Sequence, residues 1–248
     1  MIDHSEFFRD TDSDIAVLMI HGIAGTPAQF RKIIDVIPDE WTLHNILLEG
    51  HGKGVLDFGR SSMKTWRAQA LSEAENLASR HKKVFIIAHS MGTLFAIRAA
   101  VSHPDKICGL FLLSVPTRPW VRFSTMVKSF KIMVGKTGED VDTMRNGTSI
   151  LLDKNPLKYL TWIPRLIELL FEIQSVRELI PQLKVTAKSF QSYVDELVSA
   201  RSIKDLENHP YIKNTVLYNS GHFAYGDDDA EILRAELKKC IEEIKPGQ

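Results

Sequence analysis

The stretch Val84–Ala100, VFIIAHSMGTLFAIRAA, joins an apolar run to a segment with helical character. The change falls at residues 88–92, AHSMG, which have the form small-x-Ser-x-Gly. A strand that turns sharply into a helix at such a pentapeptide leaves its serine hydroxyl at the positive end of the helix, and the small residues let the two backbones approach closely. The pattern predicts a nucleophile at Ser90, and the alternative is a serine that only caps the helix. The two roles are compatible.

Other apolar runs alternate with segments of helical period along the chain. They read IAVLMIHG (15–22), LHNILLEG (43–50), KVFIIAHS (83–90), ICGLFLLSV (107–115) and TVLYNSG (215–221). A sixth run, LKVTAKSFQS (183–192), carries Lys188, which indicates an edge strand or a shifted one. Continuous apolar runs are typical of parallel strands covered by helices on both faces. The alternation predicts an α/β fold with a doubly wound, mostly parallel sheet.

Polar residues mark the expected helix starts between these runs. Thr26 and Gln29, on either side of a proline at the first helical position, have the spacing of a capping box. Thr65 opens a second helix, and Asp227–Asp229 precede the C-terminal one, where negative charge suits the positive end of the helix dipole.

Residues 117–181 break the rhythm because they contain no strand signal. A basic segment follows Thr117, and a second segment, near residues 155–176, is apolar around much of its circumference. We expect a helical cap, or lid, inserted at 117–181 into an α/β core formed by residues 1–116 and 182–248.

Length and composition point to a soluble protein with small partners. The chain has 248 residues, enough for one large α/β domain, and 31 basic residues balance 31 acidic ones, which gives no steering toward nucleic acid or an anionic membrane. Acids occupy the amino terminus where a signal peptide needs basic residues, and no apolar run reaches the roughly 20 residues that span a bilayer. We therefore expect a cytoplasmic protein without stable membrane association, in which Cys108 and Cys240 are reduced and structural.

Ligands of α/β sheets bind at the carboxyl ends of the strands, so the residues that follow each apolar run are the candidates for a functional site. HGIAG (21–25) is a glycine-rich turn after the first run. In it the backbone N–H of Ile23, together with that of Met91, would form a two-donor oxyanion hole. His21 is expected to brace this loop and not to take part in catalysis.

A general base and its orienting acid are found further along the chain. His222 follows the last apolar run, and an imidazole suits a general base at neutral pH. Asp195 lies in the loop after the run at 183–192 and is the predicted acid, with Glu196 and Asp205 close by in the sequence. The set Ser90, Asp195 and His222 therefore predicts a catalytic triad.

Taken together these motifs resemble the α/β-hydrolase superfamily, most closely bacterial carboxylesterases and monoacylglycerol lipases. The motifs are HGIAGTPAQF, LLEGHGKG, TWRAQA, AHSMG, YVDELV and SGHFAY, spread over residues 15–226. The order nucleophile, acid, base is that of this superfamily. The resemblance implies that Ile23 supplies an oxyanion N–H, that Asp195 is the acid and that His51 is a turn residue. Ala88 and Thr93 depart from the glycines usual in this group.

The implied activity is hydrolysis of carboxylic esters with short or medium acyl chains, monoacylglycerols among them, through an acyl-enzyme. No metal or organic cofactor is implied. The candidate acyl-pocket residues in the insertion are Trp120, Phe123, Met126, Trp162 and Phe171. Alternatives are a thioesterase, a hydrolase-fold binding protein with negligible turnover, and a peptidase. A peptidase would need an acid in the insertion to hold a substrate amine, and the candidates are Glu139, Asp140, Asp142, Glu168 and Glu172. The oligomeric state is left open.

Overall fold

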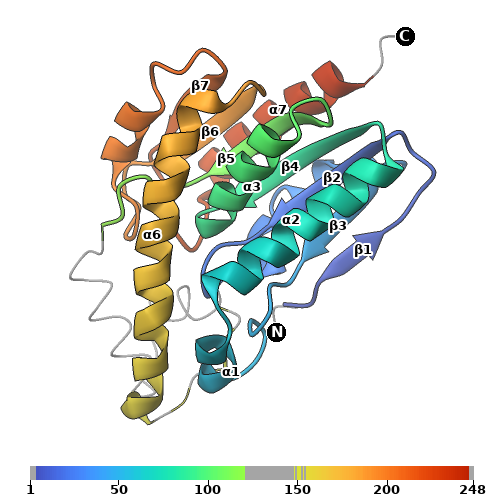
Figure 1. Cartoon of the computed structure of the whole chain (residues 1–248). Coiled ribbons are helices and arrows are strands. Elements are labelled where there is room, and N and C mark those ends of the chain that lie inside the picture. The colour runs from blue at the N-terminus through green and yellow to red at the C-terminus, as the bar shows by residue number, and fades with distance from the viewer. Residues whose placement is uncertain (1–3, 121–147, 149, 152, 154, 246–248) are drawn as a thin grey trace.

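The computed structural model describes residues 4–120, 148, 150–151, 153 and 155–245. A seven-stranded sheet in the order β1-β3-β2-β4-β5-β6-β7 forms its centre (Figure 1). The strands are β1 (Phe7–Arg9), β2 (Ile15–Ile20), β3 (Thr42–Ile46), β4 (Lys83–His89), β5 (Ile107–Leu113), β6 (Ala187–Ser192) and β7 (Ile212–Leu217). All neighbours pair in parallel except the short β1, which is antiparallel to β3. The predicted doubly wound, mostly parallel sheet is thus confirmed.

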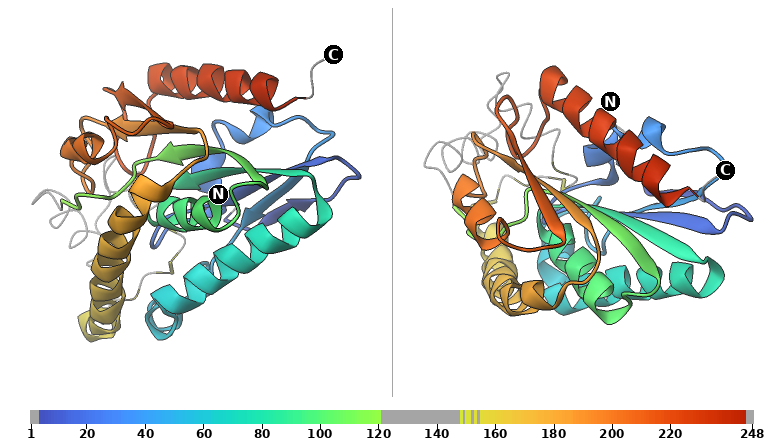
Figure 2. Two further views of the ribbon diagram at one scale, coloured as in Figure 1. Left: turned by 45° about the horizontal axis from the view of Figure 1, so that its top comes forward. Right: turned by 90° about the horizontal axis from the view of Figure 1, so that it is seen from above.

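Helices cover both faces of this sheet. The α-helices are α1 (Val55–Arg60), α2 (Met63–Arg80), α3 (Met91–Ser102), α6 (Ile163–Leu179) and α7 (Asp227–Ile244). The 3-10 helices are η1 (Pro27–Phe30), η2 (Ile34–Val36), η3 (Pro156–Trp162), η4 (Ile180–Gln182) and η5 (Ala200–Asp205). Helices α2, α3 and α6 lie on one face, and α7 lies on the other together with η1 and η2 (Figure 2).

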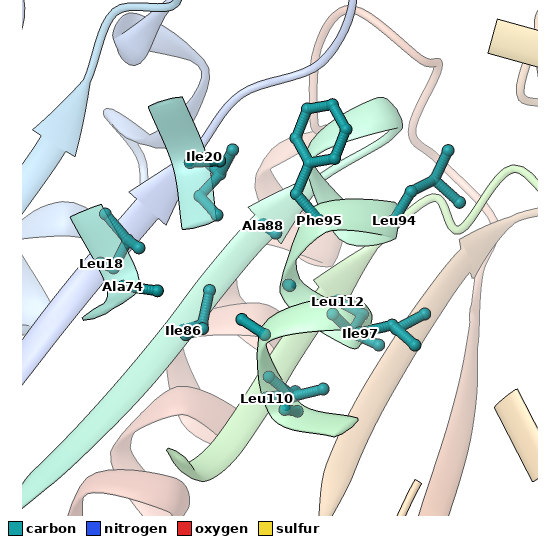
Figure 3. Packing of buried hydrophobic residues seen from close by; sticks show 14 of the residues in the cluster. Leu18, Ile20, Ala74, Ile86, Ala88, Leu94, Phe95, Ile97, Leu110 and Leu112 are labelled. Carbon is teal, nitrogen blue, oxygen red and sulfur yellow. The ribbon is translucent and has the colours of Figure 1, made fainter. Parts of the chain in front are cut away.

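The two faces of the sheet bury separate apolar cores, which explains the continuous apolar runs of the sequence. Successive side chains of a strand point to opposite faces. Leu18 therefore packs with Phe95 of α3 in one cluster (Figure 3), whereas its neighbour Met19 packs with Phe30 of η1 and Leu233 of α7 in the other. Because helices cover both sides, the residues of the central strands β2 and β4 are buried on both faces, apart from Lys83 at the start of β4.

Two helices begin at slightly different residues from those expected. Helix α2 begins at Met63, two residues before Thr65, because Ser62 is the N-cap and its hydroxyl accepts a hydrogen bond of 3.0 Å from the Thr65 N–H. Helix α7 begins at Asp227, so the three consecutive aspartates lie in its first turn and not before it. Both differences are boundary shifts, and the chemistry of the caps is as expected.

The described part of the predicted insertion is helical and is attached to the core by a buried ion cluster. Glu172 of α6, whose side chain is 3% exposed, accepts hydrogen bonds from Arg67 of α2 at 2.8 Å and from Arg98 of α3 at 2.5 Å. Two of the predicted pocket residues, Phe123 and Met126, lie outside the described residues. Among the described helices, none has the length and apolar character needed to cross a membrane.

Candidate active site

Ser90 occupies a sharp turn between β4 and α3. Its backbone has φ 51° and ψ −122°, a conformation that costs a residue with a side chain about 1–3 kcal/mol. Gly92 allows this turn, because a Cβ at that position would lie 2.2 Å from the Ile20 carbonyl oxygen and 2.7 Å from that of His21. Although Ser90 is at the N-cap position, its hydroxyl makes no capping hydrogen bond. The role as a side-chain cap is therefore wrong, and the hydroxyl is available for chemistry.

Asp195 and His222 are in direct contact, 27 residues apart in the sequence. His222 Nδ1 and Asp195 Oδ2 are 2.8 Å apart, and both residues are almost fully buried. Ser114 Oγ donates to the same carboxylate oxygen at 3.0 Å. The backbone N–H groups of Leu197 and Val198 donate to Oδ1 at 2.7 and 2.8 Å. The carboxylate therefore accepts four hydrogen bonds and is held in one orientation.

The charge state of Asp195 follows from these partners. Burial opposes ionisation of this carboxyl, but the attraction and hydrogen bond of His222, together with the two backbone N–H groups, outweigh it and lower the pKa to about 2. The acid is therefore ionised at neutral pH and accepts a hydrogen bond from the His222 Nδ1–H. That tautomer leaves Nε2 as an acceptor, as a general base requires.

Ser114 is a site residue that the sequence reasoning missed. It directly follows β5, has φ 56°, and its N–H donates to the Phe190 carbonyl at 2.8 Å while its hydroxyl donates to Asp195. The available signal was its place at the carboxyl end of an apolar run. A serine after a strand is usually an ordinary loop residue, so that position alone does not indicate a role in the site.

The three predicted triad residues lie at one edge of the sheet. Strands β4, β6 and β7 are parallel, so the loops after them, which carry Ser90, Asp195 and His222, leave the sheet at the same side (Figure 1). His89, which precedes Ser90 in the chain, lies beside His222. The His89 and His222 rings lie 4.8 Å apart, centre to centre. The fold thus brings Asp195 and His222 into contact and places Ser90 at the same edge, and the catalytic role of the three residues stays a prediction.

The glycine-rich loop after β2 lies against the serine. A Cβ at Gly22 would be 2.9 Å from the Cβ of Ser90, so only glycine fits there. Within the described part of the chain, neither the Ile23 N–H nor the Met91 N–H donates to another protein group. That these two donors bind an oxyanion stays a prediction.

His21 braces this loop. Its Nδ1–H donates to the Gly22 carbonyl at 2.8 Å, and its Nε2 accepts from the Leu48 N–H at 3.0 Å, which joins the loops after β2 and β3. Burial lowers the pKa of His21 to about 4, so the ring is neutral at pH 7. Gln29 does not close the expected capping box, because its side-chain oxygen accepts from the Gly22 N–H at 3.4 Å.

The predicted pocket residues that the structure describes lie in different places. Trp120 is 60% exposed, and its backbone N–H donates to the Leu197 carbonyl at 2.7 Å, which places it beside the loop of the acid. Trp162 donates through its indole N–H to the Val55 carbonyl at 3.0 Å and packs against α1. Phe171 is 71% exposed and lines a depression between α2 and α6 that contains no triad residue. Their role in substrate binding stays a prediction.

Comparisons with known proteins agree with this architecture. Residues 15–130 match a family model described as the alpha/beta hydrolase fold. A structure of the metagenome-derived lipolytic enzymes LipS and LipT superposes with a TM-score of 0.72, covering 96% of this chain and 98% of that one at 21% identity. The chain is therefore an α/β-hydrolase-fold protein, and the resemblance suggested by the motifs is confirmed.

Two bacterial esterases are similar to this chain in sequence. A thermostable monoacylglycerol lipase of Bacillus sp. (strain H-257) is 29% identical over 111 residues, 44% of each protein. A pimeloyl-[acyl-carrier protein] methyl ester esterase of Yersinia enterocolitica is 28% identical over 103 residues, which are 42% of this chain and 37% of that protein. The chain thus aligns with less than half the length of either relative.

Proposed function

We propose that this protein is a serine esterase that hydrolyses carboxylic esters with short or medium acyl chains. The observation that carries the proposal is the 2.8 Å contact between His222 Nδ1 and the ionised Asp195, at the edge of the sheet where Ser90 lies in a strained turn. A histidine held by a buried carboxylate, together with a serine hydroxyl that makes no capping hydrogen bond, is the arrangement that activates a serine nucleophile.

The proposed reaction has two halves with the same proton carrier. Ser90 Oγ attacks the ester carbonyl carbon while His222 Nε2 takes its proton, and the oxyanion is bound by the N–H groups of Ile23 and Met91. Collapse of this intermediate breaks the carbon–oxygen bond of the alcohol, which leaves with the proton from His222. Water then attacks the acyl-serine, gives its proton to His222, and the acid departs as Ser90 regains that proton.

The substrate class is supported by similarity and by the character of the described surface near the site. One of the related proteins named above is a monoacylglycerol lipase and the other is a methyl ester esterase, and monoacylglycerols are within the proposed range. Trp120, an exposed aromatic residue beside the loop of Asp195, offers an apolar surface to an uncharged acyl group. The proposed partner is thus a small ester.

The peptidase alternative needs an acid that is free to bind a substrate amine. Glu172 is engaged by two arginines, as described above, and Glu168 accepts a 2.8 Å hydrogen bond from the Met63 N–H while also pairing with Arg165. These two acids therefore stabilise the attachment of α6. The other candidates, Glu139, Asp140 and Asp142, lie outside the described residues.

The test is hydrolysis of p-nitrophenyl esters of graded chain length by the wild-type protein and by Ser90→Ala. We expect turnover by the wild type, loss of it in the variant, and labelling of Ser90 by a fluorophosphonate. An absence of both hydrolysis and labelling in the wild type would favour the binding-protein alternative. Faster turnover of amino-acid amides or of thioesters than of oxygen esters would replace the esterase proposal by the corresponding one.

A further inference from the structure

We propose that Glu196 is a positioning residue that holds the backbone of His222, so that consecutive acids fix this histidine at two points. The inference rests on the proposed esterase function and deepens it. Asp195 contacts the ring of His222, whereas Glu196 Oε2 accepts the backbone N–H of the same residue at 2.7 Å. A hydrogen bond to an ionised acceptor at this distance is among the stronger ones in proteins.

The packing around Gly221 shows that the Glu196 carboxylate is fitted closely to the histidine loop. A Cβ at Gly221 would lie 2.9 Å from both carboxylate oxygens of Glu196, closer than a real Cβ comes to such atoms. The Gly221 N–H itself donates within the loop, to the Ala224 carbonyl at 3.1 Å. Glycine at 221 is therefore what allows the carboxylate to reach the His222 N–H.

The other end of the same loop is held from α7. Asp229, which is buried, accepts the Asn219 N–H at 2.7 Å and the Ser220 hydroxyl at 2.6 Å. These contacts stop before Gly221. Glu196 is therefore the described side chain that binds the main chain of His222 itself, and its neighbour Asp195 binds the ring.

The consecutive position of the two acids makes them a single support. Asp195 Oδ1 accepts the N–H groups of Leu197 and Val198, which folds the 195–198 segment into a tight turn. The ring contact and the backbone contact therefore move together with this turn. If the backbone contact is removed, the imidazole keeps its acid but can shift relative to Ser90, and a misplacement of about 1 Å costs on the order of 100-fold in rate.

The first experiment compares Glu196→Ala with Glu196→Gln, and with Glu207→Ala, which removes an exposed carboxyl group in the next loop. Glutamine keeps an acceptor oxygen at the same reach. We expect kcat of Glu196→Ala to fall about 10- to 100-fold with KM unchanged, and Glu196→Gln to recover most of the loss. Glu207→Ala should match the wild type. A folded Glu196→Ala with wild-type kcat would overturn the proposal, as would a Gln variant no better than the Ala variant.

The second experiment disturbs the same Glu196–His222 contact by a substitution at Gly221. In Gly221→Ala the added methyl group pushes the Glu196 carboxylate away from the His222 N–H, so kcat should fall by a similar factor. In the double variant Glu196→Ala/Gly221→Ala the carboxylate is absent, and we expect the rate of Glu196→Ala with no further loss. Full additivity of the two losses would show that Gly221 acts on something other than Glu196 and would count against the proposal.

A spectroscopic measurement separates failure of this inference from failure of the esterase proposal. The proton on His222 Nδ1 gives a low-field NMR resonance, assigned by its disappearance in His222→Gln. We expect Glu196→Ala to broaden it by faster exchange with water and Glu196→Gln to retain it. If no ester is hydrolysed but the resonance responds in this way, Glu196 positions the histidine and the proposed esterase function is wrong. An unchanged resonance in Glu196→Ala rejects the positioning role.

Discussion

Replacing Asp195 by asparagine tests the proposed triad through the orientation that the new amide must adopt. The carboxylate accepts from two backbone N–H groups at Oδ1, and from His222 Nδ1 and the Ser114 hydroxyl at Oδ2. An NH₂ group at the Oδ1 position would face two backbone donors that cannot change their direction. At the Oδ2 position it faces a hydroxyl, which can rotate to accept, and an imidazole, which can change tautomer. We therefore expect the NH₂ group at Oδ2.

In that orientation the amide donates to Nδ1 of His222 and forces the ring proton onto Nε2. The ring then has no acceptor for the proton of Ser90, and the same replacement in a serine protease triad lowers kcat about 10⁴-fold. A loss of about 10³- to 10⁴-fold corresponds to about 4–5.5 kcal/mol of transition-state stabilisation. The fold should persist. The lowered pKa of Asp195, about 2, means that the ionised carboxylate contributes about 2 kcal/mol of folding stability at neutral pH relative to its protonated form, and we expect a loss of that order.

The assay is kcat/KM on p-nitrophenyl butyrate together with a thermal melt, for Asp195→Asn and for Asp205→Asn as the matched control. Asp205 lies at the end of η5 and pairs with Arg118 at 2.7 Å. It makes no described contact with the three predicted triad residues, so its amide variant should keep the wild-type rate. The reasoning is refuted if folded Asp195→Asn retains more than about a tenth of the activity, because the wrong tautomer cannot act as a base.

Three further outcomes are expected. Ser90→Gly and Ser90→Ala should both be inactive, but the glycine variant should be more stable by about 1 kcal/mol in denaturant titrations, since only alanine keeps a Cβ at φ 51°. Burial disfavours the charged His44 ring, but the hydrogen bonds and charges of Glu73 and Asp10 outweigh burial and raise the pKa of His44. The charged ring therefore contributes its full stability below the unfolded pKa of 6.5, and this contribution disappears as pH rises through the folded pKa. The melting temperature of His44→Gln should fall short of the wild type at about pH 5.5 and approach it at about pH 8.5. Glu172→Ala should cost about 3–5 kcal/mol in the same titrations, because it leaves two arginines near a buried site without their acid; an unchanged midpoint would show that α6 is held by its apolar contacts alone.

The sequence was sufficient for the sheet and for the residues that end its strands, and the reason is physical. Apolar runs buried on both faces have few polar positions to confuse the pattern. Strands β2, β4, β5 and β6 lie within the expected runs, β3 begins one residue before its run, and β7 begins three residues before its run. Lys188 was the exception. It was expected to mark an edge strand or a shifted one. The edge interpretation is wrong because β6 lies between β5 and β7, and the ammonium group reaches Glu236 of α7 at 3.0 Å. A partner on a distant helix cannot be recognised from the local sequence.

Part of the candidate site could be predicted because its residues stand at the ends of recognisable strands. Ser90, Asp195 and His222 follow strands, and the topology alone places the ends of parallel strands together. Contacts that depend on side-chain direction were not predictable in this way. Ser114 contributes a hydroxyl to Asp195, and Glu196, which looked like an alternative acid, faces the backbone of the histidine and not its ring.

The backbone strain of the described chain is confined to this site. Three residues other than glycine have positive φ, namely Ala24, Ser90 and Ser114, at 51°, 51° and 56°. They lie in the predicted oxyanion loop, at the predicted nucleophile and beside the predicted acid, at the ends of β2, β4 and β5. Glycine is the residue that usually occupies such conformations. None of these three residues is a glycine, so the sequence gives no sign of the positive φ angles. Strain of this kind persists only where the surrounding packing enforces it. At Ser90 this packing is the close approach of Gly92 to the Ile20 carbonyl. The stability given up at these turns is a cost of holding the proposed reacting groups in place.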